Sequence, residues 1–325
     1  MLPNKRPHKS RRSFCNLRYL HYMKCTADIF CLLSLLALSF RSVAQAPDID
    51  PSFPVARNGK LQLISDQFSF TEGPAADAGG NVFFTDQPNN KIWKYDTNGS
   101  LTVFMDNAGR ANGLYFNRRG ELIVCADENN QLWSLSPSGK ISVLVDTFQS
   151  KKLNGPNDVW INKKGDMYFT DPYYQREYWK RTKPDLKLQS VYLLKRGSHN
   201  QVSVEDSLVK PNGIVGTPDG KCLYVADIGA SKTYKYTINR DGTLGEKKLF
   251  AEMGSDGMTI DNQGNVYLTG NGVTVFNKDG VRIKHIPVPA KWTGNVCFGG
   301  ENNDWLFITA SEKLFKIKMQ VKAAN

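Results

Sequence analysis

Asn81-Val-Phe-Phe-Thr-Asp86 is a short hydrophobic run that ends on an aspartate, directly behind the turn sequence Asp77-Ala-Gly-Gly80. Glu72-Gly73-Pro74 stands in front of that turn. β-Branched and aromatic residues favour strands, and glycine behind aspartate favours a tight turn. The stretch therefore predicts a hairpin in which a polar residue leads the first strand and an aspartate closes the second.

The same unit recurs six times along the chain. Each copy begins with a polar residue beside glycine or aspartate, and the six leading residues are Glu72, Asn112, Asn157, Asn212, Asp256 and Asn295. They are separated by 40, 45, 55, 44 and 39 residues, which fits the four-stranded blades of a β-propeller. A third strand follows in each copy, and a fourth in all but the last, for example Lys91–Tyr95 and Ser100–Met105.

The two ends of the chain complete each other. The last copy stops after its third strand, Lys313–Lys318, while the segment Asn58–Asp66 near the start matches the fourth strand Asn98–Asp106 in character. A first strand that closes the last blade would remove an exposed sheet edge. We therefore predict an all-β chain with a single six-bladed β-propeller over residues 58–320, whose last blade is closed by the N-terminal strand.

The net charge of +11 over 325 residues is concentrated at the N-terminus. Residues 1–44 carry +7 of it, so only +4 remains for the rest of the chain. No arginine-rich helix or nucleic-acid motif accompanies this charge. We expect no nucleic-acid partner.

The N-terminal segment has the order of a signal peptide. A basic start at Met23-Lys24 precedes the apolar run Ile29–Phe40 and a small-residue exit at residues 41–46. The run is shorter than the roughly 20 residues that span a bilayer, so no membrane association is expected after its removal. We predict a signal peptide over residues 1–44, with Met23 as an alternative start, a linker over 45–57, and export to the periplasm or the medium.

Equivalent blades would bring the leading polar residues to one mouth of the central axis. Glu72, Asn157, Asn212 and Asp256 then offer carboxylate and amide oxygens without imidazole or thiolate. Such hard ligands suit Ca²⁺, Mg²⁺ or Mn²⁺. We predict one divalent cation, Ca²⁺ in the first place, with Mg²⁺, Mn²⁺ and Zn²⁺ as alternatives. The competing interpretation is that these pairs are turn formers, but Glu72 does not suit a turn.

An insertion follows the third copy and accounts for the 55-residue interval. It runs from about Pro172 to Ser190 and is rich in tyrosine, tryptophan, lysine and arginine. It is either a lid over the site or a solvated loop. We predict substrate contacts from Asn112, Asn157, Asp171 and Tyr173. For Asp171, as for Asp86, Asp127 and Asp227, the alternative is that a strand-ending aspartate caps a turn.

Five motifs together resemble the gluconolactonase/senescence-marker (regucalcin-like) family over essentially the whole mature chain. They contain Glu72-Gly-Pro, Asn157-Asp-Val, Asp171-Pro, Pro-Asn212-Gly and Ser-Asp256-Gly-Met. The resemblance implies a six-bladed propeller with one catalytic divalent cation, ligated by Glu72, Asn212 and Asp256. It also implies Asn157 as a further ligand or substrate contact. Gly155 stands where animal members carry a substrate-contacting arginine, so the chain is more similar to the bacterial gluconolactonase branch.

The function that these observations predict is hydrolysis of a small-molecule sugar lactone (EC 3.1.1.-, with 3.1.1.17 as the particular case). The cation would polarise the lactone carbonyl and activate water, and Asp256 would be the catalytic proton acceptor. The alternatives are another metal-dependent esterase or phosphotriesterase, or a non-catalytic propeller that binds sugars or proteins. The sequence leaves the oligomeric state open.

Overall fold

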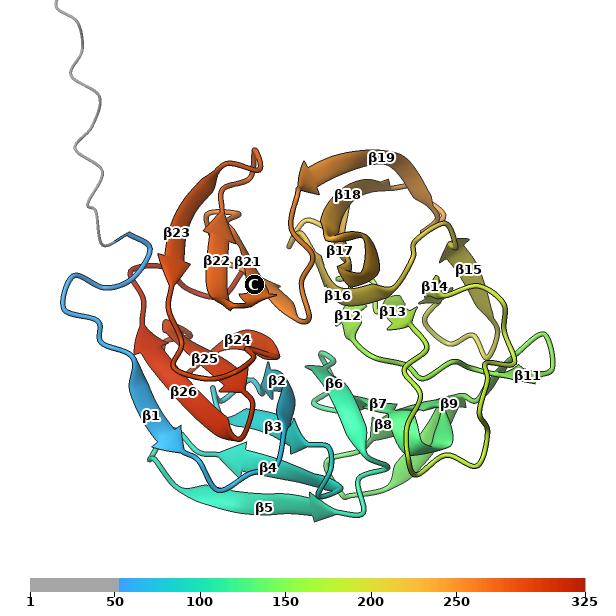
Figure 1. Cartoon of the computed structure of the whole chain (residues 1–325), viewed down its shortest axis with the longest axis horizontal. Helices are drawn as coiled ribbons and strands as arrows, with labels where there is room; N and C mark the ends of the chain where they lie inside the picture. The colour runs from blue at the N-terminus through green and yellow to red at the C-terminus, as the bar shows by residue number, and fades with distance from the viewer. Residues whose placement is uncertain (1–52, 325) are drawn as a thin grey trace, which may run out of the picture. The chain divides into compact units, whose positions relative to one another are not determined.

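Each copy of the repeat forms one four-stranded antiparallel sheet in the computed structural model, which describes residues 53–324. The six sheets stand in a ring (Figure 1), so the predicted six-bladed propeller is confirmed. In these residues the only helices are two 3₁₀ turns, η1 (Asp127–Asn129) and η2 (Ile228–Ala230). The described residues contain no helix that is long and apolar enough to cross a membrane. The predicted signal peptide, residues 1–44, and most of the linker lie outside the described part.

The blades are numbered in chain order. Within blades one to five, the first strand lies next to the axis and the following strands lie successively further out. Blade one consists of β2 (Thr71–Ala76), β3 (Val82–Asp86), β4 (Lys91–Tyr95) and β5 (Leu101–Asp106). Blade two consists of β6 (Ala111–Phe116), β7 (Leu122–Ala126), β8 (Gln131–Leu135) and β9 (Ile141–Val145). Blade three consists of β12 (Val159–Ile161), β13 (Met167–Asp171), β14 (Ser190–Leu194) and β15 (Gln201–Glu205). Blade four consists of β16 (Pro211–Gly216), β17 (Cys222–Asp227), β18 (Lys232–Ile238) and β19 (Leu244–Ala251). Blade five is β20 (Met258–Ile260), β21 (Val266–Gly270), β22 (Gly272–Phe276) and β23 (Arg282–Ile286). A small hairpin, β10 (Thr147–Phe148) with β11 (Lys151–Lys152), stands between blades two and three.

Blade six joins the two ends of the described chain. It consists of β24 (Asn295–Gly299), β25 (Trp305–Ala310), β26 (Lys313–Lys318) and β1 (Gln62–Ser65). Gln62 pairs with Lys316 and Leu63 with Phe315 in an antiparallel register. Figure 1 shows β1, at the blue end of the chain, beside the red β26. The predicted closure is confirmed, and it fixes the ring because a propeller with an open first blade would expose the edge of β26.

The core lies between neighbouring blades rather than inside any one of them. Leu223 and Val225 of β17 share one buried cluster with Val266 and Leu268 of β21. Each sheet is apolar on both faces and gains stability only when the next blade covers it. The innermost strands are thereby held at fixed positions around the axis, and the polar residues that the repeat marks lie within two residues of their starts.

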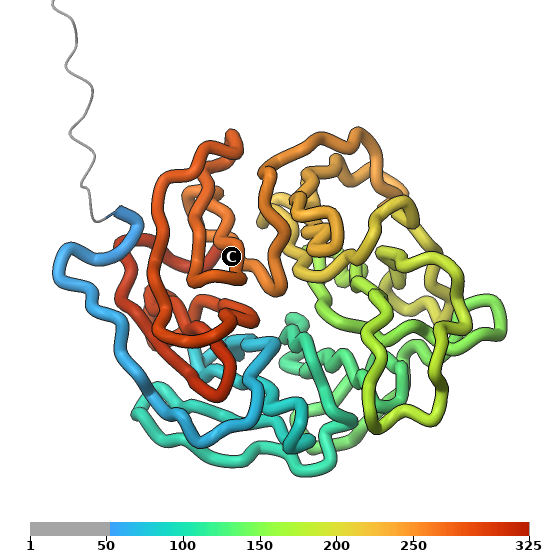
Figure 2. Tube along the Cα trace, viewed as in Figure 1, coloured from blue at the N-terminus to red at the C-terminus, as the bar shows by residue number. Residues whose placement is uncertain are grey.

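The insertion after β13 is the longest connection between two strands of one blade. It runs from Pro172 to Gln189 before β14 begins, and Figure 2 shows it as an extended loop over blade three. Trp179 and Leu186 are buried within it.

Candidate active site

The leading polar residues gather where the six innermost strands begin. Glu72, Asn112, Asn212 and Asn295 lie in these strands, and Asn157 and Asp256 stand two residues before β12 and β20. Neighbouring blades touch at this level, because the amide of Gly113 donates to the carbonyl of Asn157 (2.7 Å). The structure therefore brings residues of all six repeats to one end of the propeller axis, as equivalent blades require.

The glycine behind the leading residue is required by this close approach. A Cβ atom on Gly73 would lie 2.0 Å from the carbonyl oxygen of Asn112, and one on Gly213 would lie 2.7 Å from that of Asp256. Backbone of the next blade cannot move aside for a side chain. Asn112 and Asn212 lie inside strands β6 and β16, so the interpretation of these pairs as turn formers is wrong for both.

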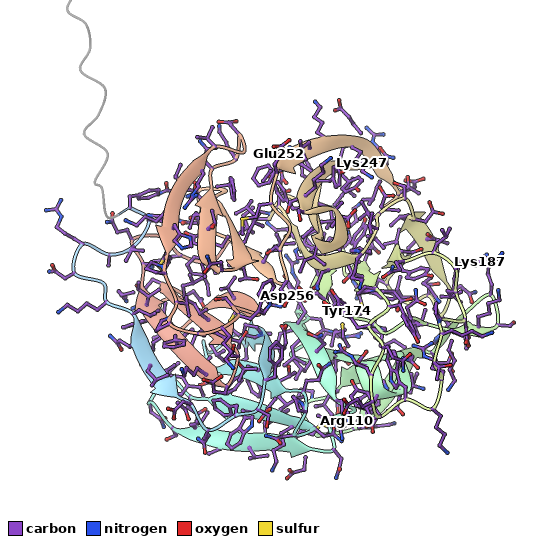
Figure 3. All side chains as sticks on the ribbon, viewed as in Figure 1. Arg110, Tyr174, Lys187, Lys247, Glu252 and Asp256 are labelled. Atoms are coloured by element: carbon purple, nitrogen blue, oxygen red, sulfur yellow. The ribbon has the colours of Figure 1, made fainter. Side chains whose placement is uncertain are left out.

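Glu72 and Asp256 lie next to each other although they belong to blades one and five. The negative charge of Asp256 acts directly on Glu72, so the two carboxyl groups lie within short electrostatic range of each other. The carboxylate of Asp256 also accepts from Nδ2 of Asn212 (2.8 Å) and from Nε1 of Trp292 (2.6 Å). Glu72 is buried, whereas Asp256 is partly exposed. Figure 3 shows Asp256 close to the middle of the ring, with Tyr174 beside it.

The electrostatics of this pair favour a bound proton or cation. Burial raises the pKa of Glu72 well above its ordinary value, and the negative charge of Asp256 raises it further. Burial also raises the pKa of Asp256, although hydrogen bonds from Trp292 and Asn212 oppose the rise. Two adjacent carboxyl groups cannot both ionise without cost in a buried site. A divalent cation between them would remove that cost.

Asn212 has an unpaired oxygen that fits such a cation. Its Nδ2 donates to Asp256 and to the hydroxyl of Tyr174 (2.9 Å), while its Oδ1 is buried and has no hydrogen-bond partner. Residues 53–324 contain no cluster of three or more histidine, cysteine, aspartate or glutamate side chains placed to hold a metal. A cation here would therefore take amide oxygens beside the two carboxylates, which is the donor chemistry of Ca²⁺.

Asn112 and Asn157 lie in the same ring, and their side chains are buried. The carbonyl of Asn112 accepts from the hydroxyl of Thr85 (3.1 Å), and the amide of Asn157 donates to the carbonyl of Thr170 (2.9 Å). These backbone bonds fix both residues at the end of the axis where Glu72 lies. Their roles as ligand or substrate contact stay predictions.

The structure places Asp171 and Tyr173 outside this group. Asp171 is fully buried, and its two oxygens accept from the amides of Asn154 and Gly155 (both 2.8 Å). That arrangement agrees with a capping role. The ring of Tyr173 packs against Trp179 inside the insertion, with the ring centroids 5.8 Å apart. The substrate contacts predicted for Asp171 and Tyr173 stay predictions that these bonds do not support.

Two residues at the site lie outside the repeated motif. Tyr174 of the insertion contacts Asn212 through its hydroxyl, and Lys210 Nζ lies 4.4 Å from the centre of its ring. Trp292, in the connection from β23 to β24, binds Asp256 and is 38% exposed. Neither residue could be predicted from the sequence, because only positions that recur in the repeat could be located.

A cavity of about 490 Å³ occupies the opposite end of the axis. It is lined by the far ends of the innermost strands, and Asp158 and Asn295 reach it from the ring. Glu72, Asn212 and Asp256 do not line this cavity. The candidate site and the cavity thus belong to the two different mouths of the propeller.

A six-bladed propeller with a cluster of oxygen side chains at the start of its innermost strands defines a class of axial-site propellers. Residues 70–312 match the family described as "SMP-30/Gluconolactonase/LRE-like region", and the chain belongs to this family. The resemblance seen in the motifs is thereby confirmed.

The relatives carry related names. The chain is 29% identical over 190 residues to a gluconolactonase of Zymomonas mobilis, which covers 54% of this chain and 53% of the relative. It spans about half the length of the curated relatives that it matches. A gluconolactonase structure from Xanthomonas campestris has a TM-score of 0.76 at 27% identity, over 82% of this chain and 91% of that one. A calcium-binding regucalcin of Agrobacterium tumefaciens (TM-score 0.70, 19% identity, 83% and 96% covered) shares the fold alone.

Proposed function

We propose that the protein is a metal-dependent hydrolase of small sugar lactones. The observation that carries the proposal is the adjacent pair Glu72 and Asp256 beside the unpaired Oδ1 of Asn212. Similarity to gluconolactonases along the blades supports the choice of a lactone as the substrate. A purely structural axis would need neither carboxylate.

The residues at the site suit one divalent cation. Glu72, Asn212 and Asp256 would hold it, Asn157 is the candidate for a further ligand, and Ca²⁺ is the cation that we expect. When bound, such an ion polarises a carbonyl group and lowers the pKa of water.

Asp256 is the residue of the chain that can accept a proton during hydrolysis. It is more open than Glu72, and its two oxygens are held by Asn212 and Trp292, which fixes the direction of the carboxylate. When a cation is bound, the water that it would acidify needs only a correctly oriented carboxylate nearby to take its proton. Water that approaches the lactone from the open side would therefore meet Asp256 first.

The test is hydrolysis of glucono-δ-lactone by the purified protein before EDTA treatment, after it, and after return of Ca²⁺, Mg²⁺, Mn²⁺ or Zn²⁺ singly. We expect activity to disappear with EDTA and to return with Ca²⁺. Glu72→Gln, which keeps the shape of the ligand but removes one charge, is expected to need a higher Ca²⁺ concentration for the same rate. Full activity in protein shown to be free of metal would contradict the proposal.

We also propose that the chain is exported, on the basis of its basic start, apolar run and small-residue exit. The N-terminal sequence of protein recovered from the extracytoplasmic fraction tests this. Cleavage after Ala44 supports export, and an uncleaved chain in the cytoplasm contradicts it.

A further inference from the structure

One of the strand-ending aspartates departs from the rule that the other three follow. Each of those three accepts hydrogen bonds from two backbone amides in front of its own blade's first strand. The pairs are Asp86 with Ser69 and Phe70, Asp171 with Asn154 and Gly155, and Asp227 with Val209 and Lys210. Asp127, at the equivalent position of blade two, binds side chains instead.

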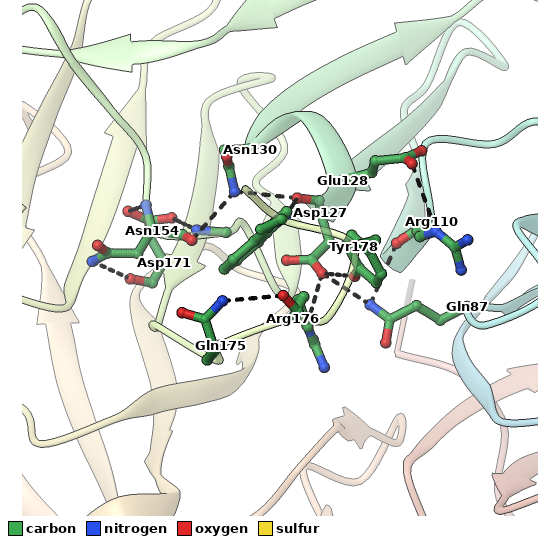
Figure 4. Close-up of polar contacts among 12 residues, drawn as sticks. Gln87, Arg110, Asp127, Glu128, Asn130, Asn154, Asp171, Gln175, Arg176 and Tyr178 are labelled. Atoms are coloured by element: carbon green, nitrogen blue, oxygen red, sulfur yellow. Dashed lines mark hydrogen bonds and ion pairs between the residues drawn. The ribbon is translucent and has the colours of Figure 1, made fainter. Parts of the chain in front are cut away.

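Asp127 is bound by the insertion of the neighbouring blade (Figure 4). Its Oδ2 accepts from Nε of Arg176 (2.9 Å), from the hydroxyl of Tyr178 and from Nε2 of Gln87 (3.4 Å). The indole of Trp179 donates to its backbone carbonyl (3.1 Å). Three side chains of one loop therefore bind this single buried aspartate. Its carboxylate accepts from side chains of the loop and not from the backbone amides that the other three aspartates cap.

These contacts fix the part of the insertion around Arg176 and Trp179 in place, while residues 182–185 are exposed to solvent. Trp179 and Leu186 are buried, and Arg181 donates to the carbonyl of Asn154. A Cβ atom on Gly155 would lie 2.5 Å from Oδ1 of Asp127 and 3.1 Å from the ring of Trp179. The absence of a side chain at position 155 is thus what lets the insertion pack against blade two.

Arg176 is the residue that this anchoring directs toward the site. Its side chain is 23% exposed, and its guanidinium lies 5.4 Å from the ring centre of Tyr174, whose hydroxyl binds Asn212. Burial raises the pKa of Glu72 and of Asp256, and the positive charge of Arg176 opposes that rise in both. The guanidinium is therefore within electrostatic reach of both carboxyl groups.

The terminal nitrogens of Arg176 are available. Within residues 53–324 its Nε is occupied by Asp127, while the two terminal nitrogens donate no hydrogen bond to the protein. Because Nε of the guanidinium is bound to Asp127, the terminal N–H groups point in fixed directions within one plane. This geometry suits hydrogen bonds to hydroxyl and carboxylate oxygens. Neither terminal nitrogen is among the buried polar atoms without a partner in the described residues, so a ligand can reach both from solvent.

We infer that Arg176 is a substrate-binding residue that determines specificity, with Asp127 as its positioning residue. This inference rests on the proposed function for the reaction at the site. The terminal nitrogens of Arg176 donate to oxygens of the substrate that lie away from the carbonyl under attack. The substrate class is accordingly a lactone with several hydroxyl groups or an acid group, in preference to a lactone that carries only carbon and hydrogen on its ring.

The experiment compares kcat and KM for glucono-δ-lactone and for δ-valerolactone, which lacks ring hydroxyls, in Ca²⁺-loaded protein. Arg176→Ala is expected to raise KM for glucono-δ-lactone about tenfold or more and to leave δ-valerolactone within about twofold. Arg176→Lys restores little, because an ammonium cannot bind Asp127 and the substrate in one plane. Asp127→Asn is expected to raise KM in the same selective way. Lys180→Ala, an exposed position of the same insertion, is the control and should change neither.

Equal losses on both lactones, or an unchanged KM in Arg176→Ala, overturn the inference, provided that thermal unfolding shows the variants to be folded. A wild-type protein that hydrolyses neither lactone would end the proposed function. Calorimetric binding of D-gluconate to the Ca²⁺-loaded protein then decides the inference separately. Binding that weakens about tenfold in Arg176→Ala supports it. Equal affinity, or no binding by the wild type, overturns it.

Discussion

Asp256 carries two tasks in the proposed site, as a ligand and as the proton acceptor, and it is partly exposed. Asp256→Ala is therefore expected to lower kcat for glucono-δ-lactone by at least about 100-fold, while the propeller stays folded. Steady-state kinetics and thermal denaturation check the two parts. Asp106→Ala, which removes an exposed carboxylate paired with Lys91, is the matched control. A kcat within a few-fold of wild type would remove Asp256 from the reaction.

Asp158 makes the stability of the protein depend on pH. Burial raises its pKa to about 7, although its carboxylate accepts from the amide of Val159 (2.9 Å). The folded state therefore binds a proton that the unfolded state has lost, and the free energy of unfolding falls as pH rises from about 4 to about 7.

Asp158→Asn keeps the shape and the acceptor oxygen but has no charge to bury. It is expected to be more stable than wild type at pH 8, by about 1 to 4 kcal/mol, and equal to it near pH 4. Burial also raises the pKa of Asp171 to about 7, so part of the fall in the free energy of unfolding with pH remains in both proteins. Urea unfolding at several pH values measures the difference. A variant less stable than wild type at pH 8 would show that the charge of Asp158 stabilises the fold.

At the same scale, the sequence could predict only those site residues that occupy a repeated position. Glu72, Asn212 and Asp256 were found because equivalent places in equivalent blades must meet at the axis. Tyr174 and Arg176 stand in an insertion that occurs once, so nothing in the repeat indicated their direction. The sequence singles out Tyr173, whereas Tyr174 is the residue whose hydroxyl accepts a hydrogen bond from Asn212. Which of two adjacent side chains faces the axis depends on the anchoring at Asp127, a contact between blades that has no local signal.

Among the elements, the strands were predictable because each repeat alternates turn residues with runs of β-branched and aromatic residues. The glycines of the first strands were harder to interpret. Asn212-Gly213 has the composition of a turn, yet it lies in β16, where backbone of blade five leaves no room for a Cβ. Close packing around the axis, which only the assembled ring creates, therefore overrides the local preference.

The element on which the ring depends most is β1. Removal of residues up to Asp66 would leave β26 with an unpaired edge and would uncover the cluster around Phe68, against which Ile64 packs. Each lost ladder hydrogen bond costs about 1 kcal/mol, so the shortened chain should lose several kcal/mol of stability and aggregate on heating. A chain that begins at Phe53 is the control. Calorimetry and light scattering test this, and equal melting of the two chains would mean that β1 does not close the ring.

For the whole molecule, the candidate ligands come from blades one, four and five, so unfolding separates them completely. A cation that binds Glu72, Asn212 and Asp256 together must then stabilise the folded propeller by mass action, by about 2.7 kcal/mol at a free concentration 100 times Kd. We expect Ca²⁺ to raise Tm of the EDTA-treated protein. The rise should be much smaller in Glu72→Gln and no smaller in Arg176→Ala, because removing a positive charge near the two carboxylates does not weaken the binding of a cation. An equal rise in Glu72→Gln would place the bound cation elsewhere on the propeller.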